Sequence, residues 1–356
     1  MAYLRNVWYV AAWDSEVKPG ELFTRKLLDE QVLFFRDEVG NVKAVADRCP
    51  HRFAPLSMGK LCGSSVQCAY HGLQFDGTGA CTKNPHGDGA IPRAAKVKAY
   101  RVIEKYSVIW IWMGSEDQAD ESLIPDFSCM DPQYMYVAKR YLHARANYVL
   151  ESDNILDLSH IQYLHPGTLG SDDVNQSITR VEQQGDTVWS YRQTINEIMP
   201  DFLYSAMGIP HGIRVDRWID VRWDAPANML LLAGAVATGG ARSEGLETPL
   251  PHLFTPETET TTHYWFAFPI PLAMGEQGKQ IAEQQVSNLN EPFSNEDLPM
   301  LEAQQHAMGD AEFWSLKPVL LPGDAGAVRA RRVLDKLIEN EQSAQSTALN
   351  ATTSAL

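Results

Sequence analysis

The sequence predicts an α+β protein with an all-β N-terminal domain and a mixed second domain. Its first 115 residues hold short β-branched and aromatic runs separated by turn signals, which is typical of a small β-sandwich. Apolar residues at helical spacing first appear over residues 146–164. A chain of 356 residues is also long enough for two domains.

The first domain is placed at residues 1–117. We expect strands where β-branched and aromatic residues cluster, over 32–35, 42–46 and 108–112. Gly-rich segments such as Asp76-Gly77-Thr78-Gly79 separate these runs and predict turns or loops.

The second domain is placed at residues 118–340. After the helix over 146–164, the pattern predicts strands within 214–236 and 260–270 and helices over 298–306 and 328–338. Residues 341–356 are rich in Ser, Thr, Ala, Asn and Gln without periodicity, so a disordered tail is expected there.

Composition and charge exclude several classes of protein. A net charge of −15 argues against general affinity for nucleic acid or an anionic membrane, because both need clustered cations. No run approaches the ~20 apolar residues of a spanning helix, and the N-terminus does not resemble a signal peptide. Five cysteines do not form a disulfide scaffold. We therefore expect a cytoplasmic protein.

Two matching Cys/His motifs lie in the first domain, Cys49-Pro50-His51 and Cys68-Ala69-Tyr70-His71. Two Cys and two His suit either tetrahedral zinc or a [2Fe–2S] cluster with both Cys on one iron and both His on the other. Zinc fingers usually separate a Cys pair from a His pair, whereas each motif here supplies one of each. This mixing favours the iron–sulfur cluster. The other cysteines fit neither motif and are expected to be ordinary buried thiols: Cys62, Cys81 and Cys129.

A second constellation lies on the predicted helix of the second domain, Asn154-x-x-Asp157-x-x-His160-x-x-x-x-His165. Asp157 and His160 are three residues apart and would share a helix face. His165 follows in a loop that could fold back toward His160. Two His and one carboxylate form the facial triad that binds non-haem Fe(II) and leaves positions open for oxygen. The pattern therefore predicts a mononuclear iron site.

Together the two motifs resemble the terminal oxygenase component of the Rieske non-haem iron oxygenases. The similarity covers residues 1 to about 340 and is strongest to the vanillate and dicamba O-demethylase branch, with toluenesulfonate methyl-monooxygenase nearby. Ala69 and Leu73 replace a Pro and a Trp that often occupy the second cluster motif, but neither position is a ligand. The resemblance implies a Rieske [2Fe–2S] domain, a helix-grip α+β catalytic domain with an antiparallel sheet, and a homotrimer.

The resemblance also assigns the iron ligands. It implies that His160 and His165 bind the mononuclear iron and that the third ligand comes from a late Glu-Asp pair, Glu296-Asp297, of which we select Asp297. Asn154 maps to a polar residue near the iron that does not bind it tightly.

The path of electrons follows from the same resemblance. A separate reductase passes them from NAD(P)H to the cluster, and we expect it to dock on residues 41–100, where eight Lys and Arg oppose three Asp. Asp157 maps to the acid that links a His ligand of the mononuclear iron to His71 of the partner subunit.

Substrate-binding residues are the least defined part of the sequence. His263 matches a position that contacts the substrate carboxylate in dicamba-type relatives, although a structural strand His is an equal alternative. Leu231 and Asn288 stand where that relative has Asn and Trp, so dicamba itself is not expected. Arg217 and Arg222 could pair with an anion, but an Arg on a strand more often forms a structural salt bridge.

The function implied is O2-dependent O-demethylation of a methoxylated aromatic acid, with release of formaldehyde. Methyl or ring hydroxylation, including cis-dihydroxylation, is the alternative within the same chemistry, although dihydroxylases usually have a longer chain and a β partner. A Rieske electron carrier without oxygenase activity is the alternative outside it. The Asp157, His160 and His165 set argues against the carrier.

Overall fold

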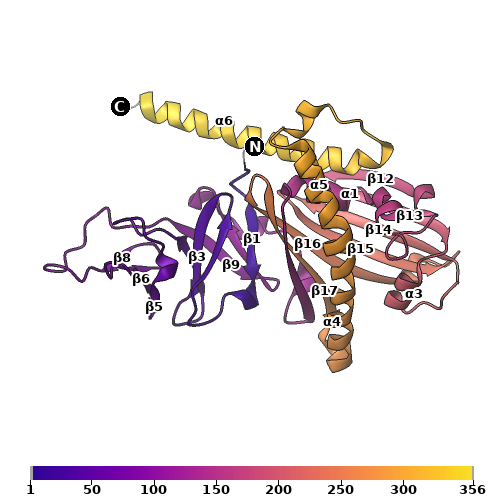
Figure 1. Ribbon diagram of the computed structural model, residues 1–356, viewed down its shortest axis with the longest axis horizontal. Helices are drawn as coiled ribbons and strands as arrows, with labels where there is room; N and C mark the ends of the chain where they lie inside the picture. Colours follow the sequence, from indigo (N-terminus) through magenta and orange to yellow (C-terminus); the bar gives the residue numbers. More distant parts are fainter. Residues whose placement is uncertain (1–2, 355–356) are drawn as a thin grey trace. The chain divides into compact units, whose positions relative to one another are not determined.

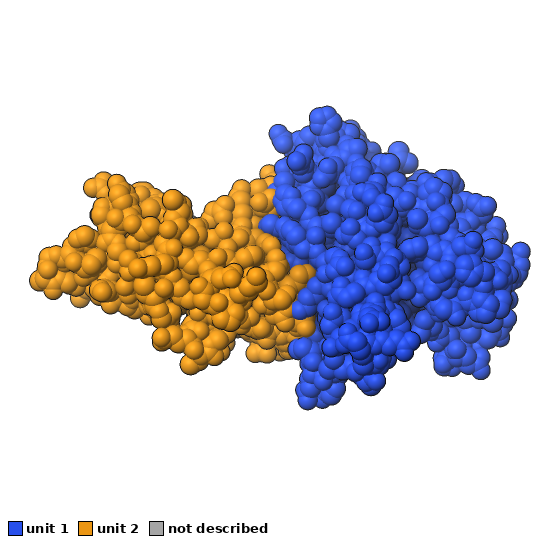
Figure 2. Space-filling view, turned by 60° about the horizontal axis from the view of Figure 1, so that its bottom comes forward, with its two compact units in different colours: residues 1–4, 125–256, 260–356 blue, residues 5–124, 257–259 orange. Residues whose placement is uncertain are grey.

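The structure is a computed structural model that describes residues 3–354, with side chains to residue 347, and it consists of two compact units (Figure 2). One unit contains residues 5–124 and 257–259, and the other contains residues 1–4, 125–256 and 260–356. The division therefore follows Ile124, a little beyond the expected boundary at residue 117.

The N-terminal unit is all-β, as the sequence predicts. Its larger sheet has six strands in the order β1-β10-β9-β4-β3-β2, and its smaller sheet is the meander β5-β6-β7-β8. The strands are β1 (Trp8–Trp13), β2 (Phe23–Leu27), β3 (Glu30–Arg36), β4 (Val42–Ala46), β5 (Lys60–Cys62), β6 (Ser65–Gln67), β7 (Gln74–Asp76), β8 (Cys81–Lys83), β9 (Ala99–Lys105) and β10 (Val108–Trp112).

The two sheets of this unit share a core that includes the motif cysteines. Cys49 and Cys68 are almost fully buried and belong to one cluster with Phe35 of β3 and Phe75 of β7. Burial of large apolar side chains on both sides therefore fixes the two segments that hold the Cys/His motifs.

The C-terminal unit is built on one seven-stranded antiparallel sheet with the order β11-β17-β16-β15-β14-β13-β12. The predicted strands within 214–236 and 260–270 are the β14–β15 hairpin and β17, while β11, β12, β13 and β16 were not predicted. The strands are β11 (Met135–Ala144), β12 (Ile178–Gln184), β13 (Thr187–Glu197), β14 (Val215–Asp224), β15 (Asn228–Ala237), β16 (Leu246–Thr258) and β17 (Thr261–Pro271).

Helices cover this sheet (Figure 1). They are α1 (Tyr148–Leu156), α2 (Ile161–Leu164), α3 (Asp201–Met207), α4 (Gly275–Pro292), α5 (Leu298–Met308) and α6 (Ala325–Ser354). Helix α4 packs on β11 and β17, and one π-helical turn, Phe293–Asp297, joins it to α5. The sequence predicted α5 and part of α6 but not α4.

The segment 146–164 is not the single helix that its apolar spacing predicts. Helix α1 ends at Leu156, and Asp157 is extended (φ −108°, ψ 95°) before a short 3-10 helix and α2 continue the chain. The Asp157 carboxylate accepts from the Ser159 backbone N–H at 2.9 Å and from its hydroxyl at 3.0 Å. An Asp that bonds its own downstream backbone competes with helix continuation, and this explains the break.

The expected disordered tail differs from the structure over residues 341–354. Helix α6 continues through them to Ser354, and residues 355–356 lie outside the described part of the chain. Glu, Gln and Ala are good helix formers, and the Ser343 hydroxyl donates to the Glu339 carbonyl at 2.8 Å inside the helix. Of the helices described, α6 included, none is long and apolar enough to cross a bilayer.

Helix α6 is fastened to α1 by one ion pair. Arg331 donates from Nε to Oδ1 of Asp153 at 3.0 Å and from Nη2 to Oδ2 at 2.5 Å, and its guanidinium lies 3.8 Å from the ring centre of Phe313. The Arg331 side chain is only 6% exposed. A bidentate Arg–carboxylate pair of this kind fixes orientation as well as distance. The pair therefore holds α1 in a fixed position against α6.

Arg331→Met is expected to destabilise the C-terminal unit, because it leaves the Asp153 carboxylate largely buried without its cation. With allowance for the partial exposure of Asp153, the loss is about 2 kcal/mol, or a Tm lower by about 4–8 °C. Arg329→Met, at an exposed position of the same helix, is the matched control. Equal Tm values for the two variants in thermal denaturation contradict this role of Arg331.

Candidate functional site

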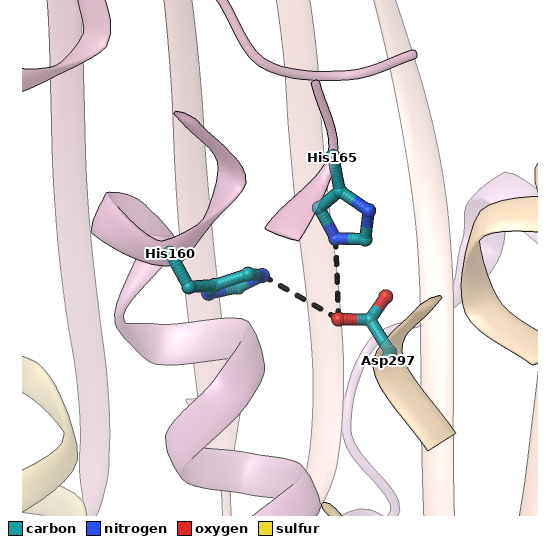
Figure 3. Close-up of side chains that lie close together, drawn as sticks. All are labelled: His160, His165 and Asp297. Atoms are coloured by element: carbon teal, nitrogen blue, oxygen red, sulfur yellow. Dashed lines mark hydrogen bonds and ion pairs between the residues drawn. The ribbon is translucent and has the colours of Figure 1, made fainter. Parts of the chain in front are cut away.

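Three of the predicted ligand side chains converge in the C-terminal unit: His160, His165 and Asp297 (Figure 3). Their ligand atoms all lie within 4.8 Å of one another. Oδ1 of Asp297 is 3.5 Å from Nε2 of His160 and 3.2 Å from Nε2 of His165. Ligands about 2.0–2.2 Å from a metal ion are separated by about 3–4 Å, so the three atoms could hold one ion with little movement.

Neighbouring groups orient both histidines. Nδ1 of His165 lies 2.5 Å from Oε2 of Glu296, and Nδ1 of His160 lies 2.6 Å from the backbone carbonyl of Asp157. An acceptor at Nδ1 fixes the tautomer that presents Nε2 to a metal. Both imidazoles therefore direct Nε2 toward Asp297. Of the Glu-Asp pair, Asp297 lies beside the Nε2 atoms, and Glu296 lies at the opposite ring nitrogen of His165.

The electrostatics of the cluster favour a cation. Burial lowers the pKa of His160. Burial also lowers the pKa of His165, but the carboxylates of Asp297 and Glu296 outweigh this effect, and the net pKa is raised. Two acids around a buried imidazole thus stabilise positive charge, which a proton or a metal ion can supply.

The π-helical turn positions Asp297. It lies between Pro292 and Pro299, neither of which can donate a backbone hydrogen bond to the helix. A π-turn inserts one extra residue into a helix and changes the direction of its side chains, and such turns are frequent at functional sites. Asp297 is thereby buried toward the histidines and also accepts from Nδ2 of Asn154 at 3.0 Å.

The two Cys/His motifs form matching loops in the N-terminal unit. The Cys49 backbone N–H donates to Ala54 and the Cys68 backbone N–H donates to Leu73, five residues on in each case. Both loops also turn through a positive φ, 61° at Phe53 and 76° at Gly72.

The loops bring like ligands together. The His51 and His71 rings are 4.5 Å apart between centroids. Burial raises the pKa of the Cys49 thiol, and the adjacent thiol of Cys68 raises it further. A thiol with a raised pKa ionises readily only beside metal cations.

A cluster fits these loops better than a single zinc ion does. Ligands 2.0–2.3 Å from one zinc lie within about 4 Å of one another. Within the described residues, the group whose ligand atoms all meet within 4.8 Å is His160, His165 and Asp297, and the Cys/His set does not meet that limit. A [2Fe–2S] cluster spreads its two Cys and two His over two irons and needs this wider arrangement.

An apolar pocket opens on the His/His/Asp cluster. Alternate residues of three adjacent strands form one wall, since alternate residues of a strand face the same side of a sheet. They are Arg217 and Ile219 of β14, Leu231 and Ala233 of β15, and Thr248, Leu250 and His252 of β16. The opposite wall comes from α3, α4 and the π-turn: Phe202, Leu203, Ala206, Met207, Gln285, Leu289 and Phe293.

Comparison with known proteins gives the same division of the chain. The model of the Rieske [2Fe-2S] domain matches residues 7–101, and that of the vanillate O-demethylase oxygenase C-terminal domain matches residues 144–340. The chain belongs to the Rieske non-haem iron oxygenases. Members of this family contain a Rieske [2Fe–2S] cluster and a non-haem iron, so the chain has both cofactors and acts as a monooxygenase component served by a separate reductase.

Named relatives place the chain within the Rieske oxygenases. It is 37% identical to the oxygenase component of chloroacetanilide N-alkylformylase of Rhizorhabdus wittichii, over 95% of this chain and 97% of the relative. It is 35% identical to that of dicamba O-demethylase of Stenotrophomonas maltophilia, over 96% and 99%. The crystal structure of dicamba monooxygenase bound to 3,6-dichlorosalicylic acid superposes with a TM-score of 0.88, at 33% identity over 96% and 99% of the two chains.

Asp157 is not placed as the sequence suggests. Its carboxylate does not bond the His160 ring; the Asp157 backbone carbonyl does. The carboxylate instead accepts from Ser159 and lies 3.7 Å from Nη2 of Arg192. The difference follows from the helix break at Asp157, which removes the shared helix face on which the expected contact depended.

Only one of the three predicted substrate-binding residues lines the pocket, and that is Leu231. His263 is buried on β17 but lies outside the pocket, where its Nδ1 is 2.8 Å from the Tyr141 hydroxyl. Asn288 accepts from Gln284 at 2.7 Å on the exposed side of α4, and its neighbours Gln285 and Leu289 line the pocket instead.

His252 is the pocket histidine that the sequence analysis missed. It is fully buried on β16, and burial lowers its pKa to about 4, so its ring is neutral at pH 7. Its Nδ1 lies 2.7 Å from the hydroxyl of Tyr264, while its Nε2 has no partner among the described residues. The Tyr264 hydroxyl occupies Nδ1, so Nε2 is the ring nitrogen that is left for a ligand of the pocket. The sequence feature that identifies it is its even spacing from Leu250 and Thr248, which places the three residues on one face of the strand.

Proposed function

We propose that this oxygenase O-demethylates a methoxylated aromatic acid and releases formaldehyde, using O2 and electrons that a reductase takes from NAD(P)H. The observation on which the proposal chiefly rests is the apolar pocket that opens directly on His160, His165 and Asp297. Apolar walls with few polar groups suit one substituted ring. The names of the relatives, among them a dicamba O-demethylase, support the reaction class.

The proposed metal ligands follow from the geometry of the two centres. His160, His165 and Asp297 would hold the mononuclear iron, which, supplied with electrons by the cluster, activates O2. In the N-terminal unit, Cys49 and Cys68 would bind one iron of the cluster, and His51 and His71 the other.

Pocket side chains are assigned to orienting the substrate and excluding water. The strand and helix walls would surround the ring with apolar surface and hold its methoxy group near the His160, His165 and Asp297 cluster. His252 donates from Nε2 to an oxygen of the substrate. Leu231 packs against the ring, and Asn154 fixes the ligand Asp297 through its hydrogen bond without binding the iron itself.

Electron entry is assigned to the exposed side of the cluster loops. His51 is exposed while the two cysteines are buried, so the imidazole side of the cluster is the side that reaches solvent. Arg52, Lys83 and Arg93 are exposed and adjoin in sequence residues that line the hollow at His51 and His71, and they would attract an acidic reductase. A cytoplasmic location of the protein is part of the proposal, because NAD(P)H is available to the reductase there.

A homotrimer is proposed from the family resemblance. In such a ring Asp157, whose side chain is 22% exposed, would lie between the mononuclear iron of one chain and His71 of the partner subunit. Asp157 would then link the two centres through its backbone carbonyl at Nδ1 of His160 and its carboxylate at His71 of the partner subunit, in addition to capping the 3-10 helix in its own chain.

Cys68→Ser is expected to abolish the visible absorption of the cluster, because one iron loses half of its thiolate pair. Cys62→Ser is the matched control in the same unit. Its thiol is half-buried and lies 3.6 Å from Oε1 of Gln67, outside the loop pair. An intact cluster spectrum in Cys68→Ser contradicts the ligand assignment.

Asp297→Ala is expected to lower total iron from about three to about two atoms per chain, since two His seldom retain Fe(II) without the carboxylate. Glu296→Gln keeps the ligands and removes only the negative charge behind His165, so iron affinity should fall about 10–100-fold. Metal analysis under a graded chelator series separates the two variants. If Glu296→Gln loses more iron than Asp297→Ala does, the third ligand is Glu296.

The function itself is tested by turnover of methoxybenzoates with a compatible reductase, measuring O2 uptake, formaldehyde and the aromatic product together. One formaldehyde and one phenol for each O2 consumed are expected. A hydroxymethyl product from a methylated ring, or a cis-dihydrodiol without formaldehyde, replaces O-demethylation with hydroxylation by the same site. Protein lacking the mononuclear iron should release no formaldehyde.

A further inference from the structure

Arg217 is a charged side chain buried in the wall of the pocket. It lies on β14, is only 4% exposed, and lines the pocket together with Ile219, its neighbour on the same strand face. A guanidinium remains protonated in any protein environment. The strand wall of the pocket therefore contains one buried guanidinium.

One end of this guanidinium is held by the protein. Its Nη1 donates to the Leu169 carbonyl at 3.1 Å and to Oε1 of Glu197 at 3.0 Å. Glu197 is fully buried, and the same oxygen accepts from the Ser171 hydroxyl at 2.6 Å. Because these partners are themselves fixed, the plane of the Arg217 guanidinium is fixed as well.

The other edge of the guanidinium, Nε and Nη2, has no acceptor from the described part of the protein. Nε is buried without any acceptor among the described residues, and none of them accepts from Nη2. The N–H groups of this edge are parallel and match the two oxygens of a planar oxyanion. Buried donors are normally paired, so an open edge at a ligand pocket indicates a partner supplied by the ligand.

We propose that Arg217 anchors the substrate by its acidic group, a carboxylate or a sulfonate on the aromatic ring, bound through Nε–H and Nη2–H. The aromatic nature of the occupant rests on the proposed function, whereas the requirement for an anion follows from the open edge. An anion in an apolar pocket needs a fixed cation and two good hydrogen bonds to offset its lost hydration. Arg217 supplies both.

Arg222 of the same strand shows what a purely structural arginine looks like in this sheet. Its Nε donates to Oδ2 of Asp224 at 2.7 Å, and its Nη2 donates to the Asp126 carbonyl at 2.7 Å. The corresponding edge is filled by the protein, and Arg222 does not line the pocket. Of the two strand arginines, only Arg217 keeps this edge for a ligand.

The test compares binding of 2-, 3- and 4-methoxybenzoate, their methyl esters and 4-methoxybenzenesulfonate to the holoenzyme by titration calorimetry. Arg217→Gln alone leaves Glu197 buried without its cation and can unfold the chain. The main variant is therefore Arg217→Gln with Glu197→Gln, which removes both charges and preserves shape. Arg217→Lys retains the charge but not the parallel pair of donors, and Arg222→Gln is the matched control.

The wild-type holoenzyme should bind its best acid at least about 10-fold more tightly than the matching ester, as expected for hydrogen bonds to a charged group. The double variant should lose this preference and bind the ester within about 3-fold of wild type, with Arg217→Lys intermediate and Arg222→Gln unchanged. Whichever of the carboxylate or the sulfonate binds more tightly is the anion for which the edge is built.

No acid preference in the wild type, or an unchanged preference in the double variant, overturns the anion anchor and leaves Arg217 a structural ion pair. Formaldehyde is measured in parallel to separate this inference from the proposed reaction. Binding that depends on Arg217 without formaldehyde contradicts O-demethylation and leaves the anchor standing. If acid and ester give equal formaldehyde, both in the wild type and in the double variant, the anchor is contradicted. The proposed O-demethylation is then unaffected.

Discussion

The carboxylate of Asp297 is the constraint around which the catalytic unit is arranged. Its Oδ1 lies within 3.0–3.5 Å of a side-chain nitrogen from each of Asn154, His160 and His165. These come from one segment, and Asp297 from another more than 130 residues away. Both segments depart from regular helix at this place, at Asp157 and in the π-turn Phe293–Asp297. Regular helices on both sides would aim fewer of these groups at one point.

How far the site was predictable follows from the distance between its members along the chain. His160 and His165 could be identified because ligands five residues apart leave a local pattern. Asp297 could be assigned only through a family resemblance, since no local rule links it to the histidines. The break at Asp157 was missed because apolar spacing continued across it, whereas the Asp157–Ser159 hydrogen bonds ended the helix.

The alternation of side chains between the two faces of a strand explains why His263, and not His252, was predicted to bind substrate. His252 on β16 and His263 on β17 belong to neighbouring antiparallel strands and are both buried. Only the face that each residue occupies decides which one meets the substrate, and a one-residue shift in register exchanges the faces. That register depends on the turn between the strands and on the pairing of β16 with β15, which sets His252 opposite Met229. The even spacing of His252 from Leu250 and Thr248 places the three on one face of β16, but it does not tell which face meets the pocket.

Two buried arginines use the same chemical edge in opposite ways. Arg331 directs its Nε and Nη2 to the carboxylate of Asp153, and this closed pair holds α1. Arg217 is held instead by Nη1, so its Nε and Nη2 remain without an acceptor among the described residues. Glu197 thus fixes the guanidinium without occupying the edge that matches a carboxylate. A structural acid at that edge would have occupied both of its donors. Because Glu197 binds at Nη1 instead, the buried ion pair holds the guanidinium rigid and leaves the other edge for recognition of a ligand.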